Sequence, residues 1–215
     1  ARKKYFSMPE DDSNWTWNVA WWSDPVLLGK YPEEGLKKYE KYLPKITEED
    51  MRLISEPIDV YGQNIYNGRA FRMGADGNPE EVGRVPGAGK TAVNWPVTPE
   101  CLYWGPKFLY ERYKKPIYIT ENGMACHDIV SLDQRVHDPN RIDFLARYLH
   151  ELKRAAEEID LRGYFQWSLM DNFEWEKGYA ERFGIVYVDF ETQERILKDS
   201  AYWYRDVIQT NGRDL

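Results

Sequence analysis

Apolar residues recur along the chain at two spacings, which predict alternating helices and strands. Spacings of three and four residues indicate helices, and these fall at 32–42, 50–55, 99–114, 140–159 and 199–210. Short runs rich in β-branched and aromatic residues indicate strands, and these fall at 58–66, 116–120 and 163–169, with a hairpin at 184–188 and 195–196. Strands that alternate with helices of this length predict parallel βαβ units.

The N-terminal part of the chain is more irregular. Residues 1–24 are polar and aromatic, and we expect a loop that leads into a helix begun by Asp24 as N-cap and Pro25 as first helical residue. The crowded tryptophans of this loop suit either a flat ligand or, more simply, a cover over helices; they are Trp15, Trp17, Trp21 and Trp22. The 58–66 strand is expected to be buried, and 67–96 to form one long, functional loop.

Polar side chains follow the ends of the predicted strands. Asn64 and Tyr66 end the first, Glu121 and Asn122 end the second, and residues 171–175 follow the third. Active sites of (β/α)8 barrels lie at this face, but a closed barrel needs eight strands and about 250 residues. We therefore expect residues 1–215 to be a single α/β domain fragment, about three strands of an incomplete (β/α)8 TIM barrel.

Composition excludes several classes of protein. The net charge of −7 disfavours nucleic acid and anionic membranes as partners, and no apolar run approaches the length of a membrane span. No signal peptide is visible, and two cysteines without metal-ligand spacing fit a cytoplasmic protein with no metal and no cofactor. Aromatic residues make up 15% of the chain, which suits either a packed core or a carbohydrate site.

Two motifs carry the chemistry. In the first, 118–123, a short strand delivers Glu121 to its end and an Asn-Gly turn follows, so a carboxylate is mounted on a rigid strand tip. In the second, 167–175, Glu174 is flanked by Trp167 and Trp175. A carboxylate between indole rings can bind two sugar hydroxyls while a ring covers the sugar face. Taken alone, the first motif also suits a helix or turn cap that happens to be Glu, and the second a packed strand end with a solvated Glu.

Together these motifs resemble glycoside hydrolase family 1, the β-glucosidase family. Ile-Thr-Glu-Asn-Gly and Trp-Ser-Leu-Met-Asp-Asn-Phe-Glu-Trp occur in the order and at the separation of that family, followed by Gly-Tyr, Arg-Phe-Gly and Val-Tyr-Val-Asp. The segments 63–66 and 94–100 are similar to further family motifs. The resemblance covers roughly 56–208 and implies the C-terminal half of the barrel.

The resemblance implies a role for each matching residue. Glu121 is the implied nucleophile, with Tyr66 hydrogen-bonded to it and Asn64 a neighbouring pocket residue. Trp167 is the implied floor beneath the sugar ring, and Glu174 the ligand of its 4- and 6-hydroxyls. The remaining residues implied to bind substrate are Trp175, Phe183 and Trp95. A carboxylate at Glu174 would repel a phosphate, so an unphosphorylated β-D-glycoside is the expected substrate.

The chain also departs from the family pattern. The Thr-x-Asn-Glu-Pro segment that holds the general acid/base is absent, as are the N-terminal Gln, His and Arg of the sugar site. Asn94 replaces a usual Gly, and Cys101 replaces a small residue. We expect a retaining β-glycosidase whose acid/base comes from an N-terminal half-barrel polypeptide, with the isolated half inactive. The alternative is a non-catalytic half-barrel that assembles with another chain or binds carbohydrate.

Overall fold

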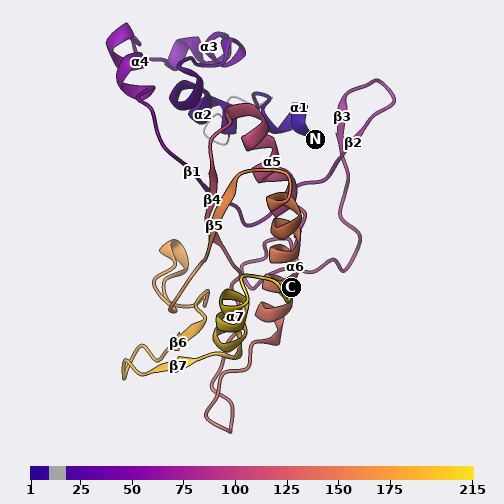
Figure 1. The fold of residues 1–215 in the computed structure, drawn as a ribbon, viewed down its shortest axis with the longest axis vertical. Helices are drawn as coiled ribbons and strands as arrows, with labels where there is room; N and C mark the ends of the chain where they lie inside the picture. Colours follow the sequence, from indigo (N-terminus) through magenta and orange to yellow (C-terminus); the bar gives the residue numbers. More distant parts are fainter. Residues whose placement is uncertain (10–17) are drawn as a thin grey trace. The chain divides into compact units, whose positions relative to one another are not determined.

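The computed structural model describes residues 1–9 and 18–215, which divide into two compact units (Figure 1). The first unit comprises Ala1–Asp59, Ala70–Gly83 and Arg112–Lys114, and the second comprises Val60–Arg69, Arg84–Glu111 and Lys115–Leu215. The prediction of a single domain stays a prediction. Trp15 and Trp17 of the tryptophan-rich segment lie outside the described residues.

The described part of the first unit is mostly helical. Its elements are α1 (Arg2–Tyr5), α2 (Val19–Leu28), α3 (Glu33–Tyr39), the 3-10 helix η2 (Glu40–Tyr42), α4 (Glu48–Ile54) and the antiparallel strands β2 (Phe71–Met73) and β3 (Pro79–Glu81). Met8, Ala20, Trp21 and Tyr39 form its buried core. Trp21 is therefore a core residue, whereas Trp22 is exposed.

Two predictions for this unit were wrong. Helix α2 begins earlier than expected, because the side chain of Asn18 accepts a hydrogen bond from the Trp21 amide at 2.8 Å and caps it. Asp24 and Pro25 lie inside the helix, and the Asp24 carboxylate binds Arg112 instead, with 2.8 Å between Oδ1 and Nε. The expected loop 67–96 contains the β2–β3 hairpin. Helix α4 begins with a capping box of Thr47 and Asp50, and it confirms the helix predicted near 50–55.

The second unit holds a sheet of three parallel strands in the order β1 (Tyr61–Asn64), β4 (Ile117–Asn122) and β5 (Leu161–Gln166), which run side by side in Figure 1. Its other elements are α5 (Cys101–Tyr113), whose last residues belong to the first unit, α6 (Pro139–Ala156), the 3-10 helix η3 (Trp175–Lys177), the antiparallel pair β6 (Val186–Val188) and β7 (Arg195–Leu197), and α7 (Asp199–Gln209). The predicted βαβ pattern and the hairpin are confirmed.

The core of the second unit follows from the apolar faces of β4 and α6. Ile117 and Ile119 of β4 are fully buried, as are Leu145 of α6 and Leu102 and Leu109 of α5. The helix predicted at 140–159 is confirmed as α6, and its buried face also includes Leu149, Leu152 and Ala155. Alternate residues of the central strand thus anchor the sheet to its helices and hold the strand end in place.

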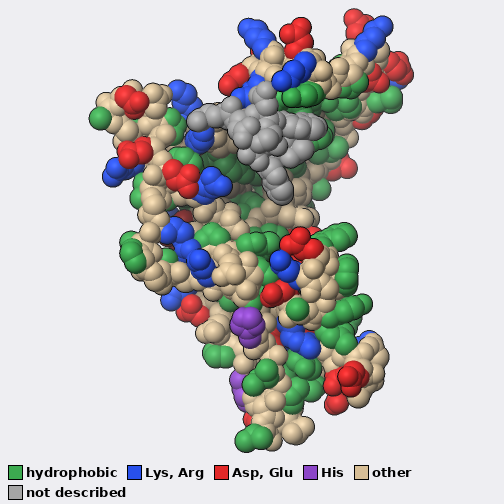
Figure 2. Space-filling model, turned by 180° about the vertical axis from the view of Figure 1, so that it is seen from behind, with side chains coloured by type: hydrophobic (Ala, Val, Ile, Leu, Met, Phe, Trp, Pro, Cys, Tyr) green, Lys and Arg blue, Asp and Glu red, His purple; other side chains and the backbone are tan. Residues whose placement is uncertain are grey.

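Strand β1 is shorter and less buried than predicted. It lies at one edge of the three-stranded sheet, and Val60 just before it is 40% exposed. Strand β5 forms the other edge, where Phe165 is 58% exposed, and Leu169 beyond it is 64% exposed. Apolar side chains stand at the surface among charged ones in Figure 2. Among the described residues, no helix combines the length and apolar character of a membrane span.

Candidate active site

Glu121 lies at the carboxyl end of the central strand β4. The Tyr66 hydroxyl, just beyond the end of β1, donates a hydrogen bond to its Oε2 atom at 2.7 Å. The Ile65 amide donates to the Glu121 carbonyl oxygen at 3.0 Å, so the backbone of the two strand ends is joined as well. The structure therefore brings together two of the residues singled out in the sequence, separated by 55 positions.

The environment of Tyr66 is strongly negative. Its pKa is raised well above the usual value, first by burial, then by the hydrogen bond to Glu121 and by the negative charges of Glu121 and Glu174. A phenol that stays protonated is a permanent donor, so Tyr66 can hold one oxygen of Glu121 at any physiological pH.

Aromatic rings lie beside the hydrogen bond between Tyr66 and Glu121. The rings of Tyr66 and Trp95 are 5.1 Å apart, those of Tyr66 and Phe183 6.4 Å, and those of Trp95 and Phe183 6.0 Å. Phe183 is buried, whereas Trp95 is 36% exposed. The three rings come from three separate segments and form an aromatic wall, which is a surface suited to the C–H faces of a sugar.

The second carboxylate, Glu174, is coupled to the first. Its pKa is raised, chiefly by burial and further by the negative charges of Glu121 and Glu181, while a hydrogen bond from Trp167 opposes the rise. Trp167, Glu174 and Glu121 thus share one electrostatic environment at the ends of β4 and β5. Trp175 is 79% exposed at the start of η3.

Asn64 lies at the same strand ends but contacts a different residue. It pairs with Glu121 in the β1–β4 register, and its Oδ1 atom accepts a hydrogen bond from the Thr120 hydroxyl at 2.7 Å. The contact stabilises the residue before Glu121, so any influence of Asn64 on the carboxylate passes through Thr120.

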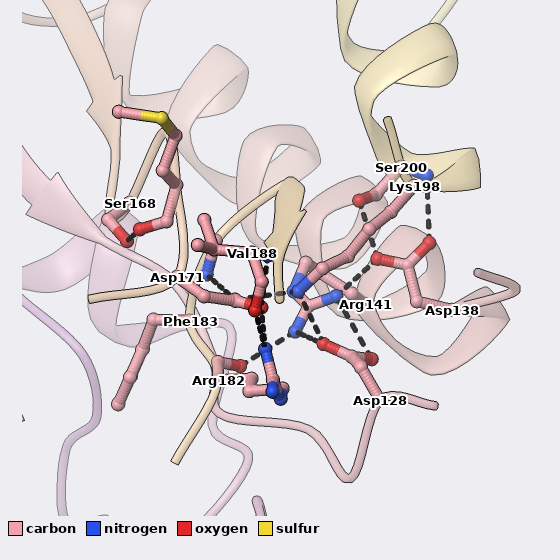
Figure 3. A network of polar contacts seen from close by, with 12 residues as sticks. Asp128, Asp138, Arg141, Ser168, Asp171, Arg182, Phe183, Val188, Lys198 and Ser200 are labelled. Atoms are coloured by element: carbon pink, nitrogen blue, oxygen red, sulfur yellow. Dashed lines mark hydrogen bonds and ion pairs between the residues drawn. The ribbon is translucent and has the colours of Figure 1, made fainter. Parts of the chain in front are cut away.

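Sequence reasoning missed the charged cluster that supports the loop between β5 and β6 (Figure 3). Lys198 is fully buried, and its Nζ atom lies 2.6 Å from Asp128 Oδ2 and 2.8 Å from Asp171 Oδ1. Arg182 lies 2.6 Å from the other oxygen of Asp171. The cluster also bonds the backbone on both sides of Phe183, since Arg141 donates to the Arg182 carbonyl oxygen and the Gly184 amide donates to Asp171. The charges are far apart in sequence, so spacing offered no signal.

The charged cluster also includes Arg141 of helix α6 and its partner Asp138. Arg141 is fully buried and binds Asp128 at 2.7 Å, and it also forms an ion pair with Asp138 (Figure 3). The Ser200 amide at the start of α7 donates to Asp138 at 2.8 Å. The three aspartates of the cluster therefore face three cations, Arg141, Lys198 and the partly buried Arg182, so its charges balance.

Parallel strands joined by helices, with paired carboxylates at the strand ends, define a (β/α)8-barrel protein of which this chain carries part. The chain belongs to glycosyl hydrolase family 1, because the sequence profile of that family matches residues 5–213. The family resemblance of the motifs and the predicted fold class are confirmed.

Individual relatives agree with this assignment. β-Glucosidase A of Thermotoga maritima is 47% identical over 198 residues, covering 91% of this chain and 44% of the relative. The 1,4-β-D-glucan glucohydrolase of Thermotoga neapolitana is 45% identical over the same share of both chains. The solved family 1 β-glucosidase of Thermotoga maritima has a TM-score of 0.80 at 46% identity and covers 90% of this chain. The chain spans less than half of these relatives and matches their C-terminal half.

Proposed function

We propose that this chain supplies the C-terminal half of a retaining β-glycosidase in which Glu121 is the nucleophile. The observation that carries the proposal is the hydrogen bond from Tyr66 to Glu121 at a strand end, beside the wall of Trp95 and Phe183. A nucleophilic carboxylate must be held under the anomeric carbon of a sugar, and this contact holds one oxygen while the other, Oε1, attacks.

The proposed reaction has two steps. Glu121 Oε1 forms a bond to the anomeric carbon as the bond from that carbon to the leaving oxygen breaks, and a general acid gives this oxygen its proton. Water then attacks the same carbon, the bond to Glu121 breaks, and the second carboxylate takes the proton of the water. Two inversions give net retention. The second carboxyl group needs to lie about 5–5.5 Å from Glu121.

Glu174 and Trp167 are the proposed binding site for the sugar ring. The carboxylate oxygens of Glu174 can accept hydrogen bonds from the 4- and 6-hydroxyls, while the Trp167 indole lies beneath the ring. Its negative charge disfavours a phosphorylated sugar. We therefore propose unphosphorylated β-D-glucosides and related glycosides as substrates, helped by Trp175 near the sugar and Trp95 near the aglycone. One relative, from Bifidobacterium breve, is named a bifunctional β-D-glucosidase/β-D-fucosidase.

The general acid/base is proposed to come from a polypeptide segment outside this sequence. The chain lacks the Asn-Glu-Pro segment and spans 44% of β-glucosidase A. The other carboxylates near Glu121, such as Glu181, lie on the same loop as Glu174 and offer no opposed strand. We expect no hydrolysis by the 215-residue chain alone and activity when an N-terminal half-barrel is supplied.

The test is a complementation assay. The chain is mixed with the N-terminal half of β-glucosidase A of Thermotoga maritima and supplied with nitrophenyl β-glucoside. We expect hydrolysis by the mixture, and a loss on the order of 10⁴-fold or more in Glu121→Gln, because the covalent step is removed. Glu176→Gln, an exposed carboxylate on the β5–β6 loop, is the matched control and should keep activity.

Covalent labelling identifies the nucleophile directly. A 2-deoxy-2-fluoro glucoside should add one glycosyl group to the active mixture, and peptide mass analysis should place it on Glu121. Hydrolysis that persists in Glu121→Gln would remove the nucleophile assignment. A mixture that assembles and yet neither hydrolyses nor is labelled would favour the non-catalytic half-barrel.

A further inference from the structure

The side chain of Asn122, next to Glu121, joins three strands. Asn122 is fully buried. Its Nδ2 atom donates to the Ile65 carbonyl oxygen beyond β1 at 2.8 Å, and its Oδ1 atom accepts from the Tyr164 hydroxyl of β5 at 2.8 Å. Its own carbonyl oxygen accepts from the Trp167 amide at 2.8 Å. One residue therefore contacts both neighbours of the central strand.

These contacts occur where the regular ladder of the sheet is interrupted. The register shifts between Gln63 and Asn64 on the β1 side, and between Ile119 and Asn122 on the β5 side. Irregular pairing next to a site re-aims side chains, and it also removes backbone hydrogen bonds that would otherwise set the strand spacing. The Asn122 amide supplies hydrogen bonds to both sides at this point.

The contacted residues adjoin the site. Ile65 precedes Tyr66, whose hydroxyl binds Glu121, and Trp167 is the residue proposed beneath the sugar. We propose that Asn122 and Tyr164 are positioning residues, an amide–phenol clamp that sets the spacing of Tyr66, Glu121 and Trp167. The effect of the clamp on catalysis rests on the proposed function, whereas the hydrogen bonds of the clamp do not depend on that function.

Asparagine is the residue that suits this position. The clamp needs a donor toward Ile65 and an acceptor toward Tyr164 in one short, planar group, and a carboxamide provides both. A carboxylate would lack the donor, and an apolar residue would leave two buried groups without partners. The Tyr164 ring also packs edge-on against Tyr204 of α7, with 6.3 Å between centroids, which limits the freedom of its hydroxyl.

The first test follows amide hydrogen exchange by NMR in the 215-residue chain. In Tyr164→Phe we expect exchange of the Trp167 amide to rise about fivefold, the effect of losing one hydrogen bond, with the Ile65 amide unchanged. In Asn122→Ala both amides should exchange faster. Tyr118→Phe removes a hydroxyl from the same strand, away from the clamp, and should change neither amide. Unchanged exchange in Tyr164→Phe, or equal acceleration at every sheet amide, would overturn the clamp.

The second test measures kinetics in the complemented enzyme. We expect Tyr164→Phe to lower kcat by on the order of 10-fold to 100-fold through misplacement of reacting groups, with KM within about twofold of wild type. A parallel loss of thermal midpoint without this kinetic split would mark a purely structural role and overturn the proposal. If the complemented wild type is inactive, the proposed function fails, and the exchange measurements still decide whether the clamp exists.

Discussion

At the scale of single residues, the site is defined by how two carboxylates and their donors affect one another. Glu121 accepts a hydrogen bond from the Tyr66 hydroxyl and Glu174 accepts one from the Trp167 side chain, while the negative charge of Glu121 raises the pKa of Glu174. The negative charges of Glu121 and Glu174 both raise the pKa of Tyr66. Changing Glu121 should therefore change the pKa of both Glu174 and Tyr66.

The titration of Glu174 tests this coupling. Glu121→Gln removes a neighbouring negative charge, so the pKa of Glu174 should fall toward its ordinary value. Trp167→Phe removes the hydrogen bond to the ionised form, so the pKa should rise further. NMR titration of ¹³C-labelled glutamate carboxyl groups in the chain measures both changes. Glu176→Gln is the control and should leave Glu174 unchanged. Equal titration curves in all four proteins would contradict the coupling.

At the scale of elements, the buried charge cluster ties the β5–β6 loop to α6 and α7. Asp171 accepts hydrogen bonds from Lys198 before α7 and from the Gly184 amide at 3.0 Å, and Arg141 of α6 joins the same cluster through Asp128 (Figure 3). The base of the loop that carries Glu174 is therefore tied to α6 and α7 by balanced charges.

Removing one charge from this cluster should be costly. Asp171→Asn leaves the fully buried Lys198 and the partly buried Arg182 without a full counter-charge, and we expect the free energy of unfolding to fall by about 3–5 kcal/mol. Urea unfolding followed by circular dichroism measures this change. The double variant Asp171→Asn with Lys198→Met restores the charge balance, so it should lose less than the single variant. Additive losses would show that charge balance is not the cause.

At the scale of the whole molecule, the described residues expose apolar side chains around the β5 edge of the sheet. They are Phe165, Leu169, Met170 and Phe173, exposed by 58%, 64%, 41% and 53%. Exposed large apolar side chains that lie this near one another in sequence suit an interaction site. Within the proposed function, it is the surface that an N-terminal half-barrel would cover.

Dye binding tests that expectation. The chain alone should enhance the fluorescence of an apolar dye such as anilinonaphthalene sulfonate, and addition of the N-terminal half of β-glucosidase A should remove most of the signal. Phe165→Lys should weaken both dye binding and complementation, because it places a charge in the interface. Leu132→Lys changes a fully exposed residue outside this group and serves as the control. Dye binding that persists in an assembled complex would contradict the assignment of this surface.

Much of the architecture was determined by the sequence. The alternation of apolar spacings predicted β4, β5, α5, α6 and α7 because their periodicity is set by local geometry and one-sided burial. The exceptions depended on distant partners. Asp24 looked like a helix cap but binds Arg112, and the 58–66 segment looked buried but lies at a sheet edge.

For the candidate site, too, the sequence indicated some features and the tertiary structure decided others. Two linear motifs named Glu121, Trp167 and Glu174, because a strand end and its loop are continuous in sequence. Only the tertiary structure decided which groups touch: Asn122 binds the Ile65 carbonyl oxygen across 57 positions, and Asp171 binds Lys198 across 27. Local pattern sets which way a side chain points along its own element, whereas hydrogen bonds between elements depend on register and packing that no single segment contains.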